Sequence, residues 1–190
     1  MQKTILITGA TDGIGLETAK TLVAQGHLVL LHGRNPSKLG AVAQTLGGLP
    51  SAGPVAQYVA DLSRMNEVQN LAEAVAKDHP SLDVLINNAG VFRTAQAVTP
   101  EGLDVRFVVN TVAPYLLTQR LLPRLGSSAR VVNLSSAAQD TVDLQALAGR
   151  VKLSDGAAYA QSKLAITMWS RTMAQSLGDD GPTIIAVNPG

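Results

Sequence analysis

Short apolar segments alternate along this chain with longer segments in which apolar residues recur at helical spacing. The short segments are almost continuously apolar, which is typical of parallel strands that are covered on both faces. Repeated strand–helix alternation requires crossover connections and places helices on both sides of one sheet. We therefore predict an α/β fold, a doubly wound parallel sheet. The predicted strands are Thr4–Thr8, Leu28–His32, Val55–Val59, Val84–Asn87, Arg130–Leu134 and Thr183–Asn188.

The segments between these strands predict the helices. One of them follows Ser63, a candidate N-cap, and carries an apolar stripe formed by Val68, Leu71, Ala72 and Val75. Pro114 lies within another and is expected either to kink that helix or to open its first turn. Surface turns are predicted at Gly47–Pro54 and Gly126–Ala129. The remaining helices are expected after Gly15 and over Ser37–Leu46, Leu103–Leu122 and Ala157–Ser176.

A glycine-rich segment joins the first predicted strand to the first predicted helix. Gly9, Gly13 and Gly15 have the spacing G-x-x-x-G-x-G, which differs from the usual dinucleotide fingerprint G-x-G-x-x-G. Such a segment permits a tight turn with close approach of the backbone to a ligand. The helix that follows would direct free N–H groups at a pyrophosphate. A plain tight turn is the structural alternative, but the position between strand and helix favours binding.

The end of the second predicted strand bears on which dinucleotide would bind. Arg34 lies nineteen positions after Gly15, where an acidic residue would otherwise hold a ribose 2′-hydroxyl. A guanidinium there suits a 2′-phosphate, and Gly33 leaves room for it. Arg34 as a solvated loop residue is the alternative, and Asp12 inside the glycine segment argues against a 2′-phosphate. The sequence favours NADP, with NAD as the other candidate.

Tyr159 and Lys163 are four residues apart, so a helix places both side chains on one face. A tyrosine hydroxyl is a poor base near neutral pH because its usual pKa is about 10, and a nearby ammonium stabilises the phenolate form. This pair alone is weak evidence, since many surface helices contain it.

Taken together, the motifs of this chain resemble those of the short-chain dehydrogenase/reductase family, in the family's order and across the whole chain. They are Thr8–Gly15, Asp61-Leu62, Asn87–Gly90, Asn110, Ser136, Tyr159, Lys163 and Asn188-Pro189-Gly190. The resemblance implies a Rossmann-type fold and reversible hydride transfer between a nicotinamide cofactor and a carbonyl or alcohol. It implies Tyr159 as the general acid/base and Ser136, with Ser135 as the rival, as the group that polarises the substrate oxygen. Lys163 would hold the nicotinamide ribose and stabilise the phenolate, and Asn110 would anchor a water in a proton relay.

The resemblance also implies the cofactor contacts. Ile14 is expected at the phosphates through its backbone N–H, Asp61 and Leu62 at the adenine, and Asn87 and Ala89 along the adenosine ribose. In the structural alternative, Asn87 and Asn88 bridge strands instead of contacting the cofactor. The full predicted set is Gly9, Thr11, Gly13, Ile14, Gly15, Arg34, Asp61, Leu62, Asn87, Ala89, Gly90, Tyr159, Lys163, Pro189 and Gly190.

Three further stretches resemble the retinol-dehydrogenase-like branch of the family and related bacterial oxidoreductases. They are Glu101-Gly102-Leu103 to Phe107, Val109-Asn110 and Leu116-Leu117-Thr118. The segment Gln139–Asp155 lengthens the chain between Ser136 and Tyr159, and we expect it to form a loop over the active site. This layout is similar to that of members that act on bulky apolar alcohols and aldehydes. Trp169, Met168 and Met173 are expected either in the core or in the interface of a homodimer or homotetramer.

Length and composition limit the alternatives. The 190 residues suit one domain, and a formal net charge of +1 gives no field that would attract nucleic acid or an anionic membrane. No segment has the ~18 apolar residues of a membrane span. The chain has no cysteine, and His27, His32 and His79 lack ligand spacing, so we assign no metal site and expect surface or hydrogen-bonded roles for them. We expect a cytoplasmic protein.

Two expectations concern the chain as a whole. Residues 1–190 are expected to be a single NAD(P)-binding domain that is truncated at its C-terminus, because family members continue into a substrate-binding region and a last strand. The sixth strand would then be an exposed edge of the sheet. The alternative to an enzyme is a non-catalytic dinucleotide-binding sensor on the same fold.

Overall fold

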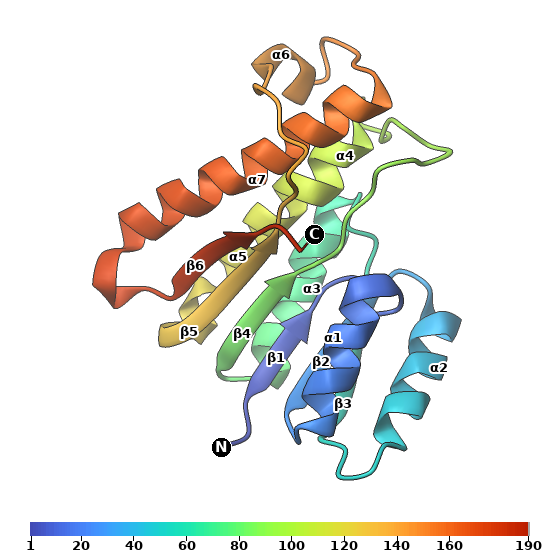
Figure 1. Cartoon of the computed structure of the whole chain (residues 1–190), viewed down its shortest axis with the longest axis vertical. Helices are drawn as coiled ribbons and strands as arrows, with labels where there is room; N and C mark the ends of the chain where they lie inside the picture. The colour runs from blue at the N-terminus through green and yellow to red at the C-terminus, as the bar shows by residue number, and fades with distance from the viewer. Residues whose placement is uncertain (190) are drawn as a thin grey trace.

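The computed structural model describes residues 1–189, and its six strands form one parallel sheet (Figure 1). The strands are β1 (Thr4–Ile7), β2 (Leu28–Gly33), β3 (Val55–Val59), β4 (Leu82–Asn87), β5 (Leu125–Leu134) and β6 (Thr183–Val187). Their order across the sheet is β3-β2-β1-β4-β5-β6. This is the order of a Rossmann-type doubly wound sheet. The predicted fold is confirmed, and each of the six strands lies where the sequence predicts one.

Helices cover the sheet in two layers. One face carries α1 (Gly13–Ala24) and α2 (Pro36–Gly47), as Figure 1 shows. The opposite face carries α3 (Met65–Asp78), α5 (Ala113–Leu121) and α7 (Asp155–Leu177). Two short helices, α4 (Val105–Phe107) and α6 (Leu144–Leu147), lie in the connections.

The central strands contribute side chains to the apolar cores on both faces of the sheet. In β1, Ile5 and Ile7 pack in the core beneath α1 and α2, whereas Leu6 between them packs beneath α3 and α5. In β2, Leu30 is buried on the second side in the same way. Because successive side chains of a strand point to opposite faces, a strand covered on both sides must be apolar throughout. This is the physical origin of the continuous apolar runs in the sequence.

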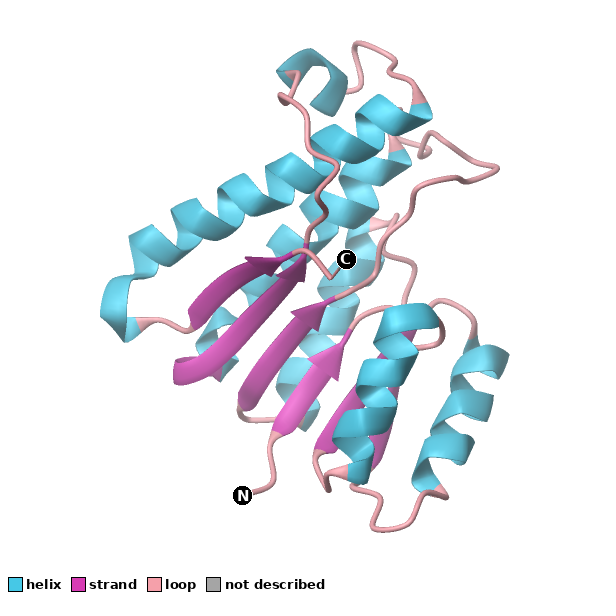
Figure 2. Cartoon of the chain, in the orientation of Figure 1, coloured by secondary structure: helices cyan, strands magenta, loops and turns pink. Residues whose placement is uncertain are grey.

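The strands all point toward the same edge of the sheet (Figure 2). The loops that leave this carboxyl edge after β1 to β5 contain the predicted site residues Gly9, Thr11, Arg34, Asp61, Leu62, Ala89, Gly90 and Ser136. In open α/β sheets, ligands bind in the crevice outside the carboxyl ends of the strands.

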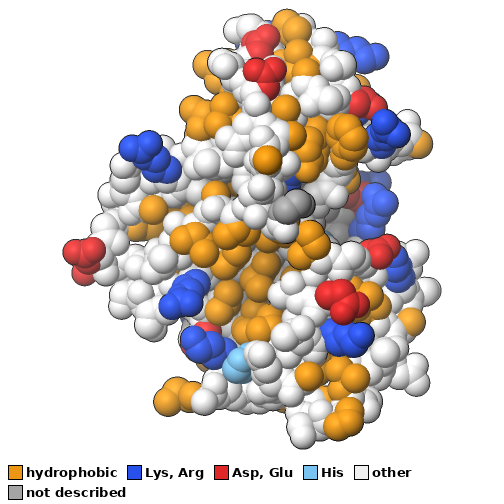
Figure 3. Space-filling model, in the orientation of Figure 1, with side chains coloured by type: hydrophobic (Ala, Val, Ile, Leu, Met, Phe, Trp, Pro, Cys, Tyr) orange, Lys and Arg blue, Asp and Glu red, His pale blue; other side chains and the backbone are white. Residues whose placement is uncertain are grey.

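At its edges the sheet is less covered. β3 and β6 are the edge strands, as predicted for β6. Ile185 of β6 is 41% exposed. Figure 3 shows apolar side chains gathered in the middle of the face that is turned to the viewer. In the same orientation, Figure 1 shows strands of the sheet lying open between α1 and α7.

The prediction of one α-helix over Leu103–Leu122 is wrong in detail. The helical run begins at Val105, because the side chain of Asp104 caps it. A π-helical turn at Val108–Val112 then precedes α5, and a 3-10 turn follows α5. Pro114 is the second residue of α5 and has no N–H to donate to the carbonyl group of Asn110, its partner in a regular α-helix. Of the two expectations for Pro114, it therefore lies in the first turn of a helix.

Two further local predictions are wrong. Gly126–Ala129 is not a turn but part of β5, because Leu125 already pairs with Leu82 and an irregularity in the register takes up the following residues. Ser63 is not the N-cap of α3. That position belongs to Arg64, while the hydroxyl group of Ser63 donates to Asp61 at 2.8 Å and closes the preceding turn.

Within residues 1–189, no helix combines the length and apolar character that crossing a bilayer requires. In the same part of the chain, no three His, Cys, Asp or Glu residues are grouped so that they could hold a metal ion.

Candidate active site

The glycine segment after β1 forms a tight loop against the loop that follows β4. Gly9 has a φ of +66°, a conformation that favours glycine. A Cβ atom on Gly15 would lie 2.3 Å from both the carbonyl oxygen of Gly9 and the side-chain nitrogen of Asn88. That nitrogen donates to the carbonyl groups of Thr8 and Gly9 at 2.9 and 3.0 Å. Gly15 is therefore required because two chain segments touch there.

The loop leads into α1, whose N-terminus carries N–H groups that have no partner inside the helix. Asp12 is its N-cap and accepts from the N–H of Gly13 at 2.9 Å. A cavity of about 580 Å³ lies beside this loop at the carboxyl edge of the sheet. Predicted cofactor residues in its wall are Gly9, Thr11, Gly13, Arg34, Asp61, Leu62, Ala89 and Gly90.

We call this cavity the candidate dinucleotide cleft, or dinucleotide cleft for short. Other predicted cofactor residues lie outside its wall. Ile14 and Pro189 line a second pocket, described below, and Gly190 lies outside the described residues. Gly15 is covered by Asn88. The side chain of Asn87 is buried and bridges secondary-structure elements, donating to Thr118 at 3.1 Å and to Asn133 at 2.7 Å. Asn88, rather than Asn87, lines the cleft.

Lys38 also lines the dinucleotide cleft, and the sequence analysis missed it. Asn35 is the N-cap of α2 and Pro36 its first residue, so Lys38 falls in the first turn, close to Arg34. The Lys38 ammonium lies 2.8 Å from a carboxylate oxygen of Asp12. This hydrogen bond, together with the N–H of Gly13, lowers the pKa of Asp12. The pair Asn35-Pro36, an N-cap before an N1 proline, is the sequence signal that predicts this placement.

A second pocket of about 260 Å³ contains Tyr159 and Lys163. Both lie on one face of α7, as predicted, and the Lys163 ammonium is 5.7 Å from the centre of the Tyr159 ring. The ammonium donates to the carbonyl oxygen of Leu134, at the end of β5, at 2.7 Å. Burial lowers the pKa of Lys163 to about 8. Tyr159 therefore has a poorly solvated cation beside its ring.

The two serines after β5 have different partners. The hydroxyl group of Ser135 donates to the carbonyl oxygen of Lys163 at 2.8 Å and lies 2.7 Å from the hydroxyl of Thr167, so it ties β5 to α7. The hydroxyl oxygen of Ser136 accepts from the N–H of Ala138 at 3.1 Å. Ser135, not Ser136, is in the wall of the Tyr159 pocket. The catalytic role of Ser136 remains a prediction.

Asn110 is fully buried and connects the loop after β4 to α7. Its side chain accepts from the N–H of Val91 at 2.7 Å and donates to the carbonyl oxygen of Val91 at 2.9 Å. It also donates to the hydroxyl oxygen of Ser162 at 3.0 Å, and that hydroxyl donates to the carbonyl oxygen of Tyr159 at 2.7 Å. Asn110 is therefore linked to Tyr159 through Ser162, and its proposed water remains a prediction.

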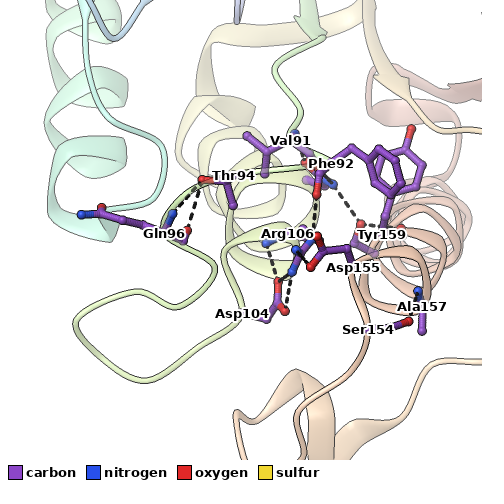
Figure 4. A network of polar contacts seen from close by, with 12 residues as sticks. Val91, Phe92, Thr94, Gln96, Asp104, Arg106, Ser154, Asp155, Ala157 and Tyr159 are labelled. Atoms are coloured by element: carbon purple, nitrogen blue, oxygen red, sulfur yellow. Dashed lines mark hydrogen bonds and ion pairs between the residues drawn. The ribbon is translucent and has the colours of Figure 1, made fainter.

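Arg106 is a buried cation that the sequence analysis missed, with 1% of its side chain exposed. Figure 4 shows its side chain among Asp104, Phe92 and Asp155. Its guanidinium makes two hydrogen bonds to Asp104, at 2.8 and 3.0 Å, and one to the carbonyl oxygen of Phe92 at 2.8 Å. It also pairs with Asp155, the first residue of α7. The Phe92 ring meets the Tyr159 ring edge-on, with centroids 4.9 Å apart. Arg106 thus contacts both the loop that carries Phe92 and the first residue of the helix that carries Tyr159.

The segment Gln139–Asp155 is not a plain loop, because it contains α6. The N–H of Asp143 donates to the side chain of Gln161 on α7 at 2.9 Å. Apolar side chains of the segment, among them Val142 and Leu144, line a groove along α5 and α7. None of the described residues in the wall of the Tyr159 pocket comes from this segment. The segment therefore contributes to the wall of the α5–α7 groove.

The α5–α7 groove has a volume of about 900 Å³ and contains Met168, Trp169 and Met173. Met168 is 54% exposed, and the Trp169 ring meets the ring of Tyr115 edge-on with centroids 5.5 Å apart. These residues lie in the wall of the groove.

Comparison with known proteins identifies the family of the chain. Residues 3–190 match the sequence profile of the short chain dehydrogenase family. Retinol dehydrogenase 13 of Homo sapiens and that of Mus musculus are each 35% identical over 193 residues, which cover 99% of this chain and 58% of the relative. The polyprenol dehydrogenase of Homo sapiens is 35% identical over 195 residues, covering 97% of this chain and 59% of that protein.

Solved structures give the same result. A crystal structure of a protein from Mycobacterium paratuberculosis matches with a TM-score of 0.87 and 33% identity, covering 100% of this chain and 68% of that one. A metagenomic short-chain oxidoreductase in complex with NADP matches with a TM-score of 0.77 and 29% identity, covering 99% of this chain and 82% of that one. The chain spans 58% of the length of the retinol dehydrogenases named above. It belongs to the short chain dehydrogenase family, and its curated relatives include retinol dehydrogenases.

Proposed function

We propose that this chain carries the cofactor-binding and proton-transfer parts of an NAD(P)-dependent oxidoreductase. The reaction is hydride transfer between the nicotinamide and a carbonyl or alcohol, with Tyr159 as the general acid/base. The observation that carries the proposal is a shared wall. Asn88, Gly90 and Val91 line both the dinucleotide cleft and the pocket that contains Tyr159 and Lys163. An extended ligand in the cleft can therefore reach Tyr159.

The residues of the cleft fit a dinucleotide. The close contact between Gly15 and Gly9 brings the loop backbone and the first turn of α1 to the wall of the cleft, where free N–H groups suit a pyrophosphate. Arg34 and Lys38 would hold a 2′-phosphate, which favours NADP over NAD. Asp61 and Leu62 would contact the adenine, and Lys163 the nicotinamide ribose. When bound, the cofactor supplies or accepts the hydride.

The chain's own residues handle the proton. During reduction, the Tyr159 hydroxyl donates its proton to the carbonyl oxygen as the hydride reaches the carbonyl carbon, and oxidation is the reverse. Lys163 stabilises the resulting phenolate, since its ammonium is poorly solvated and lies close to the ring. Ser136 would donate to the same substrate oxygen, and Asn110 would hold a water that returns the proton.

The proposed substrate is a bulky apolar alcohol or aldehyde. Ile14, Val91 and Phe92 give the Tyr159 pocket an apolar wall. Two of the relatives are named for retinol and polyprenol, which are both long isoprenoid alcohols.

We also propose a cytoplasmic homodimer or homotetramer and a single domain at residues 1–190, with the apolar α5–α7 groove as the candidate interface. Light scattering tests the oligomeric state.

The decisive experiment compares two tyrosine variants. NADPH and NADH oxidation is measured with all-trans-retinal, geranial and decanal for the unaltered protein, Tyr159→Phe and Tyr115→Phe. Tyr115 is the matched control because it lies on the α5–α7 groove. We expect Tyr159→Phe to lower kcat at least about a hundredfold, the usual contribution of general acid–base catalysis, and Tyr115→Phe to retain activity. Full activity of Tyr159→Phe would contradict the mechanism. Bound NADPH without turnover of any aldehyde or alcohol would favour a non-catalytic role.

A further inference from the structure

His32, near the end of β2, is 3% exposed and hydrogen-bonded through both ring nitrogens. The N–H of Gly9 donates to Nδ1 at 3.2 Å, and Nε2 lies 3.0 Å from the carbonyl oxygen of Ala60, just after β3. The backbone carbonyl of His32 also accepts from the N–H of Ala10 at 2.9 Å. Two consecutive amides of the glycine loop therefore end on this one residue.

Only one form of the imidazole satisfies both ring contacts. Nδ1 must accept, because it faces an N–H, and Nε2 must donate, because it faces a carbonyl oxygen. These roles require the neutral ring with its proton on Nε2. Burial, which outweighs the hydrogen bond to Ala60 and the charge of Asp61, lowers the pKa of His32 to about 4. The ring thus stays neutral at physiological pH.

The contacts of His32 fix the conformation of Gly9 from one side, while Asn88 fixes it from the other. Gly9 has its N–H on His32 and its carbonyl group on Asn88, at 3.2 and 3.0 Å. With both polar groups of this residue engaged, the loop is held in its positive-φ turn. The N–H of Gly13 is engaged by Asp12, and the other first-turn N–H groups of α1 remain for a ligand in the cleft. His32 itself forms part of the wall of this cleft.

We propose that His32 is a positioning residue for dinucleotide binding. Its neutral imidazole clamps the carboxyl ends of β1, β2 and β3 together and holds the loop in the conformation that receives the pyrophosphate. An apolar side chain would fill the same space but would leave the N–H of Gly9 and the carbonyl group of Ala60 without these partners. The inference rests on the dinucleotide binding proposed above.

Two substitutions test the contacts of Nδ1 and Nε2 separately. The side-chain oxygen in His32→Asn can take the place of Nδ1 and accept from Gly9, whereas the amide in His32→Gln takes the place of Nε2 and leaves Gly9 without its acceptor. Fluorescence titrations with NADPH and with NADH give the dissociation constants. We expect His32→Gln to weaken both dinucleotides about tenfold and by the same factor, as for one lost hydrogen bond to the loop. His32→Asn should lose no more than about threefold.

A purely structural role predicts a different result. In that case both substitutions would lower the unfolding temperature, but the folded variants would bind NADPH and NADH with the dissociation constants of the unaltered protein. Unchanged affinity in folded His32→Gln, or an equal loss in His32→Asn, would overturn the inference. If His32→Gln does not fold, nitrogen NMR of the unaltered protein still decides, because a protonated ring or a proton on Nδ1 at neutral pH contradicts the clamp. Absence of dinucleotide binding by the unaltered protein would instead contradict the proposed function.

Discussion

The Nε–H group of Arg106 donates a hydrogen bond of 2.8 Å to the carbonyl oxygen of Phe92. Asn110, one turn further along, holds both backbone polar groups of Val91. Two side chains of one helical run thus hold two consecutive residues of the loop after β4, which lines the Tyr159 pocket. Because Arg106 also pairs with Asp155, the same contact sets the start of α7 relative to that loop.

We expect Arg106→Met to lower the free energy of unfolding by about 3 kcal/mol, because removing one partner of a buried ion pair leaves uncompensated groups. Arg120→Met is the control, since Arg120 is exposed on α5, and should change stability by less than about 0.5 kcal/mol. Urea unfolding followed by circular dichroism measures both. Equal effects of the two substitutions would show that the buried network contributes nothing specific.

Lys163 should make stability rise with pH between about 8 and 10.5. Its folded-state pKa is about 8, below the ordinary 10.5, so the unfolded chain binds the proton more tightly within that window. The cost of the buried charge is fully present below the window, at about 3 kcal/mol, and disappears as the pH rises through it. Lys163→Met should flatten this rise, and the exposed Lys152→Met should not. Parallel pH profiles for the unaltered protein and Lys163→Met would contradict the assignment.

His32 should have the corresponding effect in acid. Its pKa is about 4 in the folded protein and 6.5 ordinarily, so the unfolded chain takes up the proton first as the pH falls. Stability should therefore decrease by about 3 kcal/mol from pH 6.5 to pH 4 through this residue alone. Unfolding measured across this range for the unaltered protein, His32→Asn and the control His27→Asn isolates the effect. A decrease that persists undiminished in His32→Asn would assign it to other groups.

Arg34→Ala should weaken NADPH binding about tenfold to a hundredfold, the range for a hydrogen bond to a charged group, and NADH binding by less than about threefold. Lys38→Ala should show the same selectivity with a smaller loss, because Lys38 is partly engaged by Asp12. Arg64→Ala is the matched control, as Arg64 lies outside the cleft wall. Fluorescence titration measures each dissociation constant. Equal losses of NADPH and NADH in Arg34→Ala would refute a 2′-phosphate contact.

The sequence predicted the sheet because each strand carries its own signal. Continuous apolar runs such as Leu28–His32 reflect burial on both faces, and this requirement does not depend on distant partners. The pairing of Tyr159 with Lys163 was equally accessible, since helical spacing alone puts them on one face. The order of motifs then predicts that both lie close to a bound dinucleotide.

What the sequence could not predict depends on long-range contacts. Nothing local distinguishes Arg106 from an exposed arginine, and its burial follows from Asp155, forty-nine residues later. The sequence predicts a surface or hydrogen-bonded role for His32, but its partners Gly9 and Ala60 become neighbours only when β1, β2 and β3 align. The sequence predicts the segment Gln139–Asp155 over the active site, whereas Val142, Leu144 and Leu147 of this segment line the α5–α7 groove.

The π-helical turn at Val108–Val112 has a consequence for the register of the whole segment. Each residue of an α-helix advances the side-chain direction by roughly 100°, so one residue more or fewer rotates everything that follows by that angle. Before the turn, Arg106 faces the polar network, and after it, Leu117 and Leu121 face the apolar core. If the same residues were wound as a regular α-helix, Leu117 and Leu121 would be rotated away from the core. The π-helical turn therefore allows Arg106 to contact the polar network while Leu117 and Leu121 stay in the apolar core.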